Sequence, residues 1–266
     1  MSGSPPSVLI IGARSSIAKA IGDELTSSGR TVVYADLSGQ ASPESVREVD
    51  ICSQSSCKKL LMDLEGFNLT SLVSCAGTSF SAPIAESTEE DWKRVIDVNL
   101  SGAFNVLSVF GGAWGRRKTS ASIVLTSSIN SEIPVPRYAS YCASKAGLDM
   151  LVRVAALELA PHVRVNAIAP GPVESDKETF RKFPGFAEGL RRRHPLGNRL
   201  TSPVDVAKAA LFLLSGGAAW VTGRVLTVDG GVSLNYGDSP DAFAGTSEFL
   251  IPHNLGDANN DGDSDN

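Results

Sequence analysis

The chain has 266 residues, of which 42% are hydrophobic and 20% charged, a composition typical of a globular protein with one sizeable α/β domain. Its formal net charge is −5, but residues 237–266 carry seven acidic residues and no Lys or Arg, which leaves the rest of the chain at +2. A nearly neutral body gives no electrostatic basis for binding nucleic acid or a membrane surface.

Cysteine, histidine and apolar residues narrow the protein class further. The four cysteines follow neither disulfide nor metal-ligand spacing and the three histidines are scattered, so we expect no metal site. The N-terminal residues are polar and uncharged, and no apolar run approaches the ~18 residues of a membrane span. We therefore expect no leader peptide and no membrane contact, and a reducing, cytoplasmic setting.

Short β-branched runs alternate with longer helical patterns along the chain. The expected strands are Val8–Ile11, Thr31–Ala35, Glu48–Ile51, Ser71–Ser74, Ile123–Thr126, Arg164–Ile168 and Val225–Val228. The expected helices are Ser16–Ser28, Ser55–Leu64, one opened by a capping box at Ser87-Thr88-Glu89-Glu90 and carrying Asn99, Tyr138–Ala160, and one begun by Ser202-Pro203. This alternation predicts an α/β fold with a doubly wound parallel sheet of about seven strands and helices on both faces.

No repeat or linker divides the body, so residues 1–236 are predicted to form a single domain. Within it, the variable segment 175–199 is expected to cover the substrate pocket. Residues 237–266 form an acidic extension rich in Gly, Asp, Asn, Ser and Pro, and we expect its last ten residues to be disordered.

The strongest chemical signal is the pair Tyr141 and Lys145, with Ser128 thirteen residues before the tyrosine. A helix places residues i and i+4 on one face, so the lysine ammonium can lie beside the phenol. A free tyrosine has a pKa near ~10 and cannot act as a base at neutral pH. A unit charge ~4 Å away, at an effective dielectric of ~20, supplies the roughly 4 kcal/mol needed to bring the pKa near ~7. Tyr141 is thus a candidate general acid/base, and Ser128 a candidate to orient the substrate oxygen.

A second signal indicates a nucleotide. Gly12 follows the first strand in a turn of small residues that opens a helix, where backbone N–H groups and the helix dipole can face a pyrophosphate. Asp36 ends the second strand, about where a carboxylate accepts hydrogen bonds from both ribose hydroxyls of NAD and repels a 2′-phosphate. The simpler interpretation of Asp36, as the first residue of a turn, remains open.

These motifs and several others resemble, in order, those of the short-chain dehydrogenase/reductase family in its compact single-domain branch. The matching residues are Ile11-Gly12-x-x-x-Ser16-Ile17-Ala18, Asp50-Ile51, Ser74-Cys75-Ala76-Gly77, Asn99, Ser128, Tyr141, Lys145, Pro170-Gly171-Pro172-Val173-Glu174-Ser175 and Val228-Asp229-Gly230-Gly231. The chain departs from the family where Ser16 and Ala18 replace glycines, and where Ser74 and Cys75 replace asparagines that tie the central strands together.

The resemblance implies a Rossmann-like fold, a homotetramer and a catalytic tetrad of Asn99, Ser128, Tyr141 and Lys145. In it, Lys145 binds the nicotinamide ribose and lowers the pKa of the tyrosine, and Asn99 holds a water linked to Lys145. The residues that it places at the cofactor are Gly12, Arg14, Ser15, Ser16, Ile17, Asp36, Asp50, Ile51, Ala76, Gly77, Asn99, Tyr141, Lys145, Pro170, Gly171, Val173 and Ser175.

The expected activity is hydride transfer between a secondary alcohol or ketone and NAD. NAD is preferred over NADP because the positions where NADP-dependent relatives place a basic residue hold Ser15 and Leu37, although Arg14 lies one position early and could contact a phosphate. An NADP-dependent 3-oxoacyl-carrier-protein reductase is one alternative. A non-catalytic nucleotide sensor or scaffold on the same fold is another. Substrate contacts are possible at Asn130, Ser131 and Tyr138.

Overall fold

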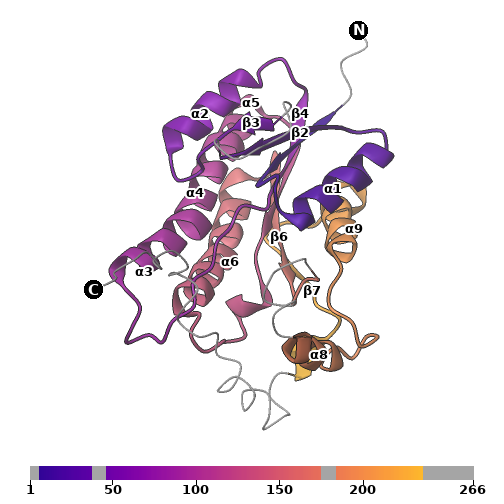
Figure 1. Cartoon of the computed structure of the whole chain (residues 1–266). Helices are drawn as coiled ribbons and strands as arrows, with labels where there is room; N and C mark the ends of the chain where they lie inside the picture. Colours follow the sequence, from indigo (N-terminus) through magenta and orange to yellow (C-terminus); the bar gives the residue numbers. More distant parts are fainter. Residues whose placement is uncertain (1–5, 38–45, 175–183, 236–266) are drawn as a thin grey trace, which may run out of the picture.

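The computed structural model describes residues 6–37, 46–174 and 184–235 of the chain. In these residues seven parallel strands form one sheet in the order β3-β2-β1-β4-β5-β6-β7 (Figure 1). The strands are β1 (Ser7–Ile11), β2 (Thr31–Asp36), β3 (Val46–Glu48), β4 (Leu69–Ser74), β5 (Ala121–Thr126), β6 (Val163–Pro170) and β7 (Val225–Val228). The chain reverses its direction of winding between β1 and β4, which opens a crevice at the carboxyl ends of these two strands.

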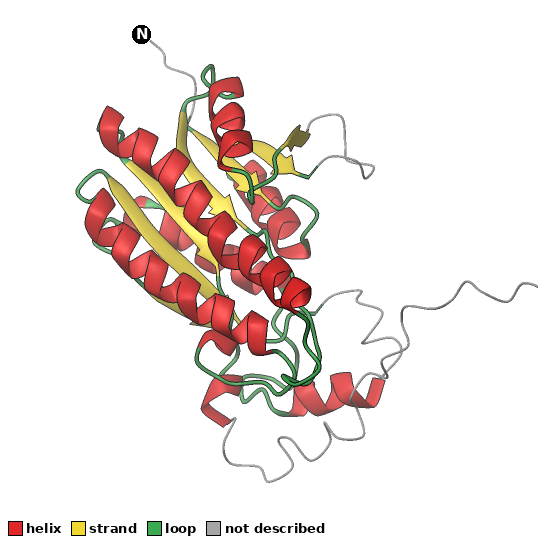
Figure 2. Cartoon of the chain, turned by 90° about the vertical axis from the view of Figure 1, so that its left-hand side faces the viewer, coloured by secondary structure: helices red, strands yellow, loops and turns green. Residues whose placement is uncertain are grey.

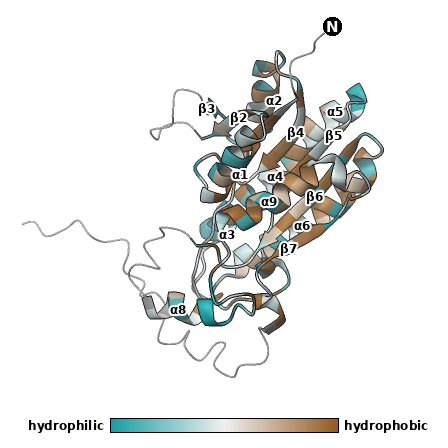
Figure 3. Cartoon of the chain, turned by 90° about the vertical axis from the view of Figure 1, so that its right-hand side faces the viewer, coloured by the Kyte–Doolittle hydropathy of each residue, from teal (hydrophilic) through white to brown (hydrophobic). Residues whose placement is uncertain are grey.

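Helices cover both faces of the sheet. They are α1 (Ser16–Ser27), α2 (Gln54–Asp63), α3 (Glu89–Ile96), α4 (Gly102–Val106), α5 (Gly112–Arg117), α6 (Ala139–Leu159), α8 (Pro184–Arg192) and α9 (Pro203–Leu214). The shorter helical turns are η1 (Asp97–Ser101), η2 (Leu107–Gly111), η3 (Ile129–Ser131), η4 (Gly216–Ala218) and η5 (Val232–Asn235). Helices α4 and α6 lie in front of the sheet in Figure 2, whereas α1 and α9 pack together on the opposite face, seen in Figure 3.

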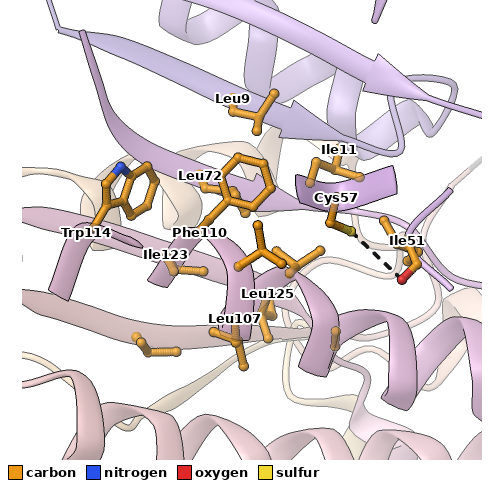
Figure 4. Packing of buried hydrophobic residues seen from close by; sticks show 14 of the residues in the cluster. Leu9, Ile11, Ile51, Cys57, Leu72, Leu107, Phe110, Trp114, Ile123 and Leu125 are labelled. Atoms are coloured by element: carbon orange, nitrogen blue, oxygen red, sulfur yellow. Dashed lines mark hydrogen bonds between the residues drawn. The ribbon is translucent and has the colours of Figure 1, made fainter. Parts of the chain in front are cut away.

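Alternate strand residues feed two separate cores. Leu9 and Ile11 point to the side of α2, α4 and α6, whereas Val8 and Ile10 point to α1 and α9. A parallel strand buried on both faces is apolar throughout, which explains the apolar colouring of the inner strands in Figure 3. The first core contains the largest fully buried side chain, Phe110, which packs edge-to-face with a tryptophan at a centroid distance of 6.3 Å (Figure 4).

One continuous helix, residues 89–117, is long and apolar enough to cross a membrane by length and composition alone. Half of its most apolar window is buried inside the protein, and Val106, Phe110 and Trp114 belong to the first core. Packing within the fold therefore accounts for its apolar face. The helix contains two π-helical stretches, η1 and η2, which interrupt the regular α-helical spacing.

The structure confirms the predicted architecture but moves two boundaries. The third strand ends at Glu48, because Asp50 begins a turn in which its carboxylate accepts the Cys52 N–H at 2.9 Å. Val49 and Ile51 are buried after the strand rather than within it. The helix that carries Asn99 is capped by Thr88, whose hydroxyl accepts the Asp91 N–H at 3.1 Å, so the predicted cap at Ser87 was wrong by one residue.

Candidate active site

A glycine turn joins β1 to α1 at the crevice. Gly12 has φ +82°, and a Cβ there would lie 2.5 Å from the backbone nitrogen of Ala76 on the neighbouring strand end. Glycine is therefore required both by conformation and by space. Ser15 caps α1 by accepting the Ile17 N–H at 3.2 Å, so the helix begins with its N–H groups beside the crevice.

The crevice is a cavity of about 490 Å³ at the carboxyl ends of β1, β2 and β4. Eight of the residues predicted at the cofactor line it: Gly12, Arg14, Ser15, Asp36, Asp50, Ile51, Ala76 and Gly77. A site of this volume, with a glycine turn and a helix N-terminus in its wall, fits a dinucleotide. In the described part of the chain no three His, Cys, Asp or Glu side chains gather as metal ligands.

Asp36 pairs with Arg14 at one end of the cavity. Its carboxylate accepts the Arg14 backbone N–H at 3.0 Å and the Arg14 guanidinium at 2.9 Å, and also the Leu37 N–H at 2.8 Å. Burial acts to raise the pKa of Asp36, but these hydrogen bonds outweigh it and hold the pKa below its ordinary value. The carboxylate is thus ionised, and a cation lies directly against it.

The opposite end of the cavity leads to the predicted tetrad through Gly77 and Thr78. Asn99, on the π-helical turn η1, accepts the Thr78 N–H at 2.8 Å and donates to the Thr78 carbonyl at 2.9 Å. Its second amide hydrogen goes to the Ser144 hydroxyl on α6 at 2.9 Å. Both donors of Asn99 are therefore used within the protein, so a water at this residue could bind only as a donor to its oxygen.

Helix α6 carries Tyr141 and Lys145 on one face, as their spacing predicts. The lysine Nζ lies 5.7 Å from the centre of the tyrosine ring and donates to the Thr126 carbonyl at 2.8 Å. Ser128 lies just beyond the end of β5, and its hydroxyl is near enough to the phenol of Tyr141 to lower the phenol's pKa. The structure therefore brings Asn99, Ser128, Tyr141 and Lys145 together beside the cavity.

The electrostatics of the pair differ from the prediction. Burial raises the pKa of Tyr141, and the nearby Ser128 hydroxyl opposes this rise without cancelling it. Lys145 is 3% exposed, and burial lowers its pKa to about 8. The prediction that Lys145 lowers the tyrosine pKa was therefore wrong for the protein alone, because desolvation of both groups is larger than their mutual interaction.

The other described residues that were predicted at the cofactor do not line the cavity. Ser16 is exposed at the start of α1, next to Ile17. Gly171 follows β6, and a Cβ there would lie 2.9 Å from Cβ of Asp229. This close approach brings the Pro-Gly-x-Val stretch against the closing Val-Asp-Gly-Gly motif. Pro170 ends β6 and Val173 bridges to Thr201. Ser175, like the acidic extension, lies outside the described residues.

The central strands remain hydrogen-bonded at Cys75, one of the two positions where the family has asparagine. The Cys75 N–H donates to the Ile11 carbonyl at 2.8 Å, and the Thr126 hydroxyl donates to the Cys75 sulfur at 3.6 Å. These contacts join β1, β4 and β5 next to the tetrad, so the substitution has not disconnected the central strands.

Comparison with known proteins identifies the family. Residues 12–233 match the profile of a family described as Enoyl-(Acyl carrier protein) reductase. A 3beta-hydroxysteroid dehydrogenase 1 of Eggerthella lenta is 39% identical over 188 residues, 68% of this chain and 71% of that protein. A 3-oxoacyl-(acyl-carrier-protein) reductase of Thermotoga maritima is 34% identical over 242 residues, 85% of this chain and 97% of that protein. The chain belongs to the short-chain dehydrogenase/reductase family.

Solved structures of this family share the fold. The ligand-free aldohexose dehydrogenase of Thermoplasma acidophilum matches with a TM-score of 0.79 at 28% identity, over 88% of this chain and 96% of that chain. As a short-chain dehydrogenase/reductase, the protein is an NAD(P)-dependent oxidoreductase that acts on CH–OH groups.

Sequence analysis missed several residues that line the cavity of this short-chain dehydrogenase/reductase. Arg94 reaches it from α3, with its guanidinium 5.6 Å from the Phe80 ring centre. No local motif marks Arg94, because only the folding of α3 over the crevice brings it there. The missed lining residues are Ile11, Leu37, Val49, Cys52, Cys75, Thr78, Arg94 and Val98. Most of them are sequence neighbours of predicted residues, and that adjacency was an available signal.

A second cavity of about 640 Å³ lies beyond β7. Its walls include His194, Thr201 and Asp229, and none of the predicted catalytic residues. Asp229 accepts the Gly231 N–H at 2.9 Å and the Ser233 N–H at 2.8 Å, which fixes the closing glycine turn. The tetrad lies next to the first cavity, because a Cβ on Gly77 of its wall would be 3.4 Å from Asn99 Oδ1 and 3.6 Å from Lys145 Nζ.

Proposed function

We propose that this protein transfers hydride between a secondary alcohol or ketone and NAD, with Tyr141 as the general acid/base. The arrangement that supports this most is the gathering of Tyr141, Lys145 and Asn99 beside a dinucleotide-sized crevice, with the Ser128 hydroxyl close to the phenol and Lys145 Nζ 5.7 Å from the tyrosine ring centre. A substrate oxygen placed between Ser128 and Tyr141 would accept a hydrogen bond from one and exchange a proton with the other.

The crevice supplies the groups that would hold the cofactor. The N-terminus of α1 and the Gly12 turn would hold a pyrophosphate, Asp36 would hold the adenosine ribose, and Lys145, which lies beside Gly77 of the cavity wall, would hold the nicotinamide ribose. When bound, the nicotinamide would supply the hydride acceptor or donor and, in its oxidised form, a positive charge.

Each tetrad residue has a separate task in this proposal. Tyr141 gives its proton to a ketone oxygen or takes the proton of an alcohol when positive charge is close, and its raised pKa means that the phenol starts protonated at neutral pH. Ser128 orients the substrate oxygen. Lys145, tied to the Thr126 carbonyl, supplies a fixed cation, and Asn99 holds the Thr78 wall of the crevice against α6.

Tyr141→Phe tests the proposal. This variant keeps the ring and loses the proton, so turnover should fall by about 10²–10⁴-fold while NAD affinity stays within about twofold. The measurement is nicotinamide absorbance with a panel of secondary alcohols, sugars and hydroxyacyl thioesters, combined with calorimetric titration of NAD. A Tyr141→Phe variant with unchanged turnover would refute the assignment. A wild-type protein that binds NAD but converts none of these alcohols would favour a sensor or scaffold instead.

NADP-dependent reduction of a 3-oxoacyl thioester is the second candidate. One observation favours it: Arg14 lies against Asp36 and offsets the charge that would repel a 2′-phosphate. One of the relatives above is a 3-oxoacyl-(acyl-carrier-protein) reductase. Tighter binding of NADP than of NAD would select this candidate.

We also propose a homotetramer in the cytoplasm. Helices α4 and α6 expose an apolar stripe made of Phe104, Met150, Val154 and Leu157. The α6 members stand at helical spacing, so they lie on one face that a second subunit can cover.

A further inference from the structure

Helix α6 carries a buried carboxylate one turn beyond Lys145. Asp149 is 4% exposed and stands at the i+4 position from the lysine, so the two side chains lie on the same face of the helix. A buried carboxylate is costly unless it is hydrogen-bonded or paired, so its presence here calls for a partner. No motif of the sequence analysis includes it.

The partner of Asp149 belongs to the reaction centre. The Ser127 hydroxyl donates a short hydrogen bond to the Asp149 carboxylate. Ser127 stands between Thr126, whose carbonyl accepts Lys145 Nζ at 2.8 Å, and Ser128, whose hydroxyl lies near the Tyr141 phenol. The carboxylate therefore holds the three-residue segment that binds Lys145 and carries Ser128.

Asp149 also acts on the charge of Lys145. Burial lowers the pKa of the lysine, while Asp149 and Cys75 act to raise it. Burial raises the pKa of the Cys75 thiol to about 11, so this group is neutral near pH 7. The phenol of Tyr141, which faces the same lysine from α6, is neutral there as well, since burial raises its pKa. Among these groups Asp149 is the anion that favours the ammonium form.

We propose that Asp149 is a positioning residue of the reaction: it keeps Lys145 cationic in a dry site and, through Ser127, fixes the strand end that carries Ser128. The inference rests on the proposed function, because it assigns Asp149 a task only if Lys145 is needed as a cation. Asp149 itself does not contact the substrate, because it acts entirely through Lys145 and Ser127.

Three variants separate the two tasks. Asp149→Asn removes the charge and keeps an oxygen that can accept the Ser127 hydrogen bond. Ser127→Ala removes that bond and keeps the charge. Asp23→Asn, on the exposed face of α1, removes one negative charge far from the site and serves as the matched control. Should Asp149→Asn fail to fold, Asp149→Ser removes the charge without burying an amide and takes its place.

The deciding measurement is the pH dependence of kcat/KM for NAD with a secondary alcohol, which follows the groups of the free enzyme. Loss of the anion lowers the pKa of Lys145. The high-pH limb of the profile, where kcat/KM falls as pH rises, should therefore move to lower pH by about one unit in Asp149→Asn. Ser127→Ala should lower kcat about threefold or more at every pH and leave the limb in place, because orientation changes and charge does not. Asp23→Asn should match the wild type.

A folded Asp149→Asn enzyme with an unshifted limb overturns the proposal, and so does an equal shift in Asp23→Asn. A uniform loss of activity in Asp149→Asn, paralleled by a fall in thermal stability alone, would show a merely structural role and also overturn it. If the wild type turns over no alcohol, the proposed function fails, and the pH dependence of calorimetric NAD affinity still tests Asp149: an unshifted profile in Asp149→Asn rejects its role.

Discussion

At the scale of single residues, Lys145 lies in an environment that disfavours its charged form. Burial lowers its pKa to about 8, although Asp149 and Cys75 act in the other direction. Because the folded-state pKa lies below the ~10.4 of a free lysine, the unfolded chain binds more protons between these values. The lysine therefore destabilises the fold at neutral pH, and this penalty disappears as pH rises toward ~10.

Lys145→Met should expose this penalty. The free energy of unfolding of the wild type minus that of the variant should increase by about 2 kcal/mol between about pH 7 and about pH 10. Any effect of the substitution that does not depend on pH cancels in this change. Urea unfolding at a series of pH values measures the difference. The control is Lys19→Met, an exposed lysine paired with Asp23 on α1, for which the two curves should stay parallel. Parallel curves for Lys145→Met would mean that the lysine is not desolvated.

Arg14 and Asp36 form the other residue pair with a functional consequence. The carboxylate favours the free ribose of NAD, while the guanidinium next to it favours the 2′-phosphate of NADP. Arg14 also has 37% of its side chain exposed, so it can reorient toward a phosphate. In our proposal, the opposing effects of the Asp36 carboxylate and the Arg14 guanidinium set the preference between NAD and NADP.

Arg14→Gln should therefore increase the ratio of NAD to NADP affinity by about tenfold, which corresponds to ~1.4 kcal/mol. Fluorescence titration at low and high salt measures both affinities, and the loss of NADP affinity should shrink as salt rises. Arg117→Gln, which removes a charge paired with Glu65 on the surface, should leave the ratio unchanged. A ratio that moves toward NADP in Arg14→Gln would contradict the assignment.

At the scale of elements, two helix caps of the same chemistry have different consequences. Ser202 caps α9 and shares a capping box with Asp205, whose carboxylate also pairs with Arg199 at 2.6 and 3.1 Å. Ser15 caps α1 and lines the cofactor cavity. The first cap supports packing of α9 on α1, whereas the second also shapes the binding site.

Ser202→Ala and Ser15→Ala should each lower the free energy of unfolding by about 1 kcal/mol, because each leaves a helix N–H without its partner. Only Ser15→Ala should weaken NAD binding as well, by several-fold. Chemical denaturation and calorimetric titration of the same two proteins separate the effects. Equal NAD affinities in both variants would argue against the cavity at α1 as the cofactor site.

Elements with a clear periodicity were predictable from the sequence, whereas those shaped by tertiary contacts were not. Strand β1 and helix α6 have the expected bounds within a residue or two, since apolar runs and helical spacing are local signals. Strand β3 was misplaced because Val49 and Ile51 are apolar for a different reason, namely burial beneath the helices after the strand has ended. Apolarity alone does not distinguish these cases.

The same limit applies to the site. The tetrad and the glycine turn could be predicted, because each depends on a few residues at fixed spacing. The pKa of Tyr141 could not, since the sequence does not reveal how deeply a phenol and an amine will be buried. Asp149 escaped notice for a similar reason: a carboxylate four residues after Lys145 resembles a solvent-exposed helix position until α6 packs against β6 and brings it to Ser127.

At the scale of the whole molecule, the exposed apolar residues of α4 and α6 call for a covering surface. Leu157 is 82% exposed and Met150 54%, although they belong to the long helix that carries Tyr141 and Lys145. A charge at this stripe should prevent association without touching the cavity.

Leu157→Glu should convert the proposed tetramer to smaller species, measured by light scattering coupled to gel filtration. Glu158→Gln, a change of charge at the neighbouring position of α6, is the control and should keep the assembly. If the wild type is already a monomer, the stripe has another purpose and the tetramer is refuted. Thermal denaturation of both variants excludes misfolding as the cause.

The Cys52 thiol lines the cofactor cavity but should react slowly with electrophiles. The thiol stands at the mouth of the cofactor cavity, where alkylation or oxidation would obstruct the nucleotide. Burial and the nearby Asp50 carboxylate raise its pKa to about 11, so roughly one thiol in a thousand or fewer is a thiolate at neutral pH. Since the thiolate is the reactive form, the enzyme should retain its cofactor affinity through air exposure and maleimide treatment that would modify an ordinary surface cysteine.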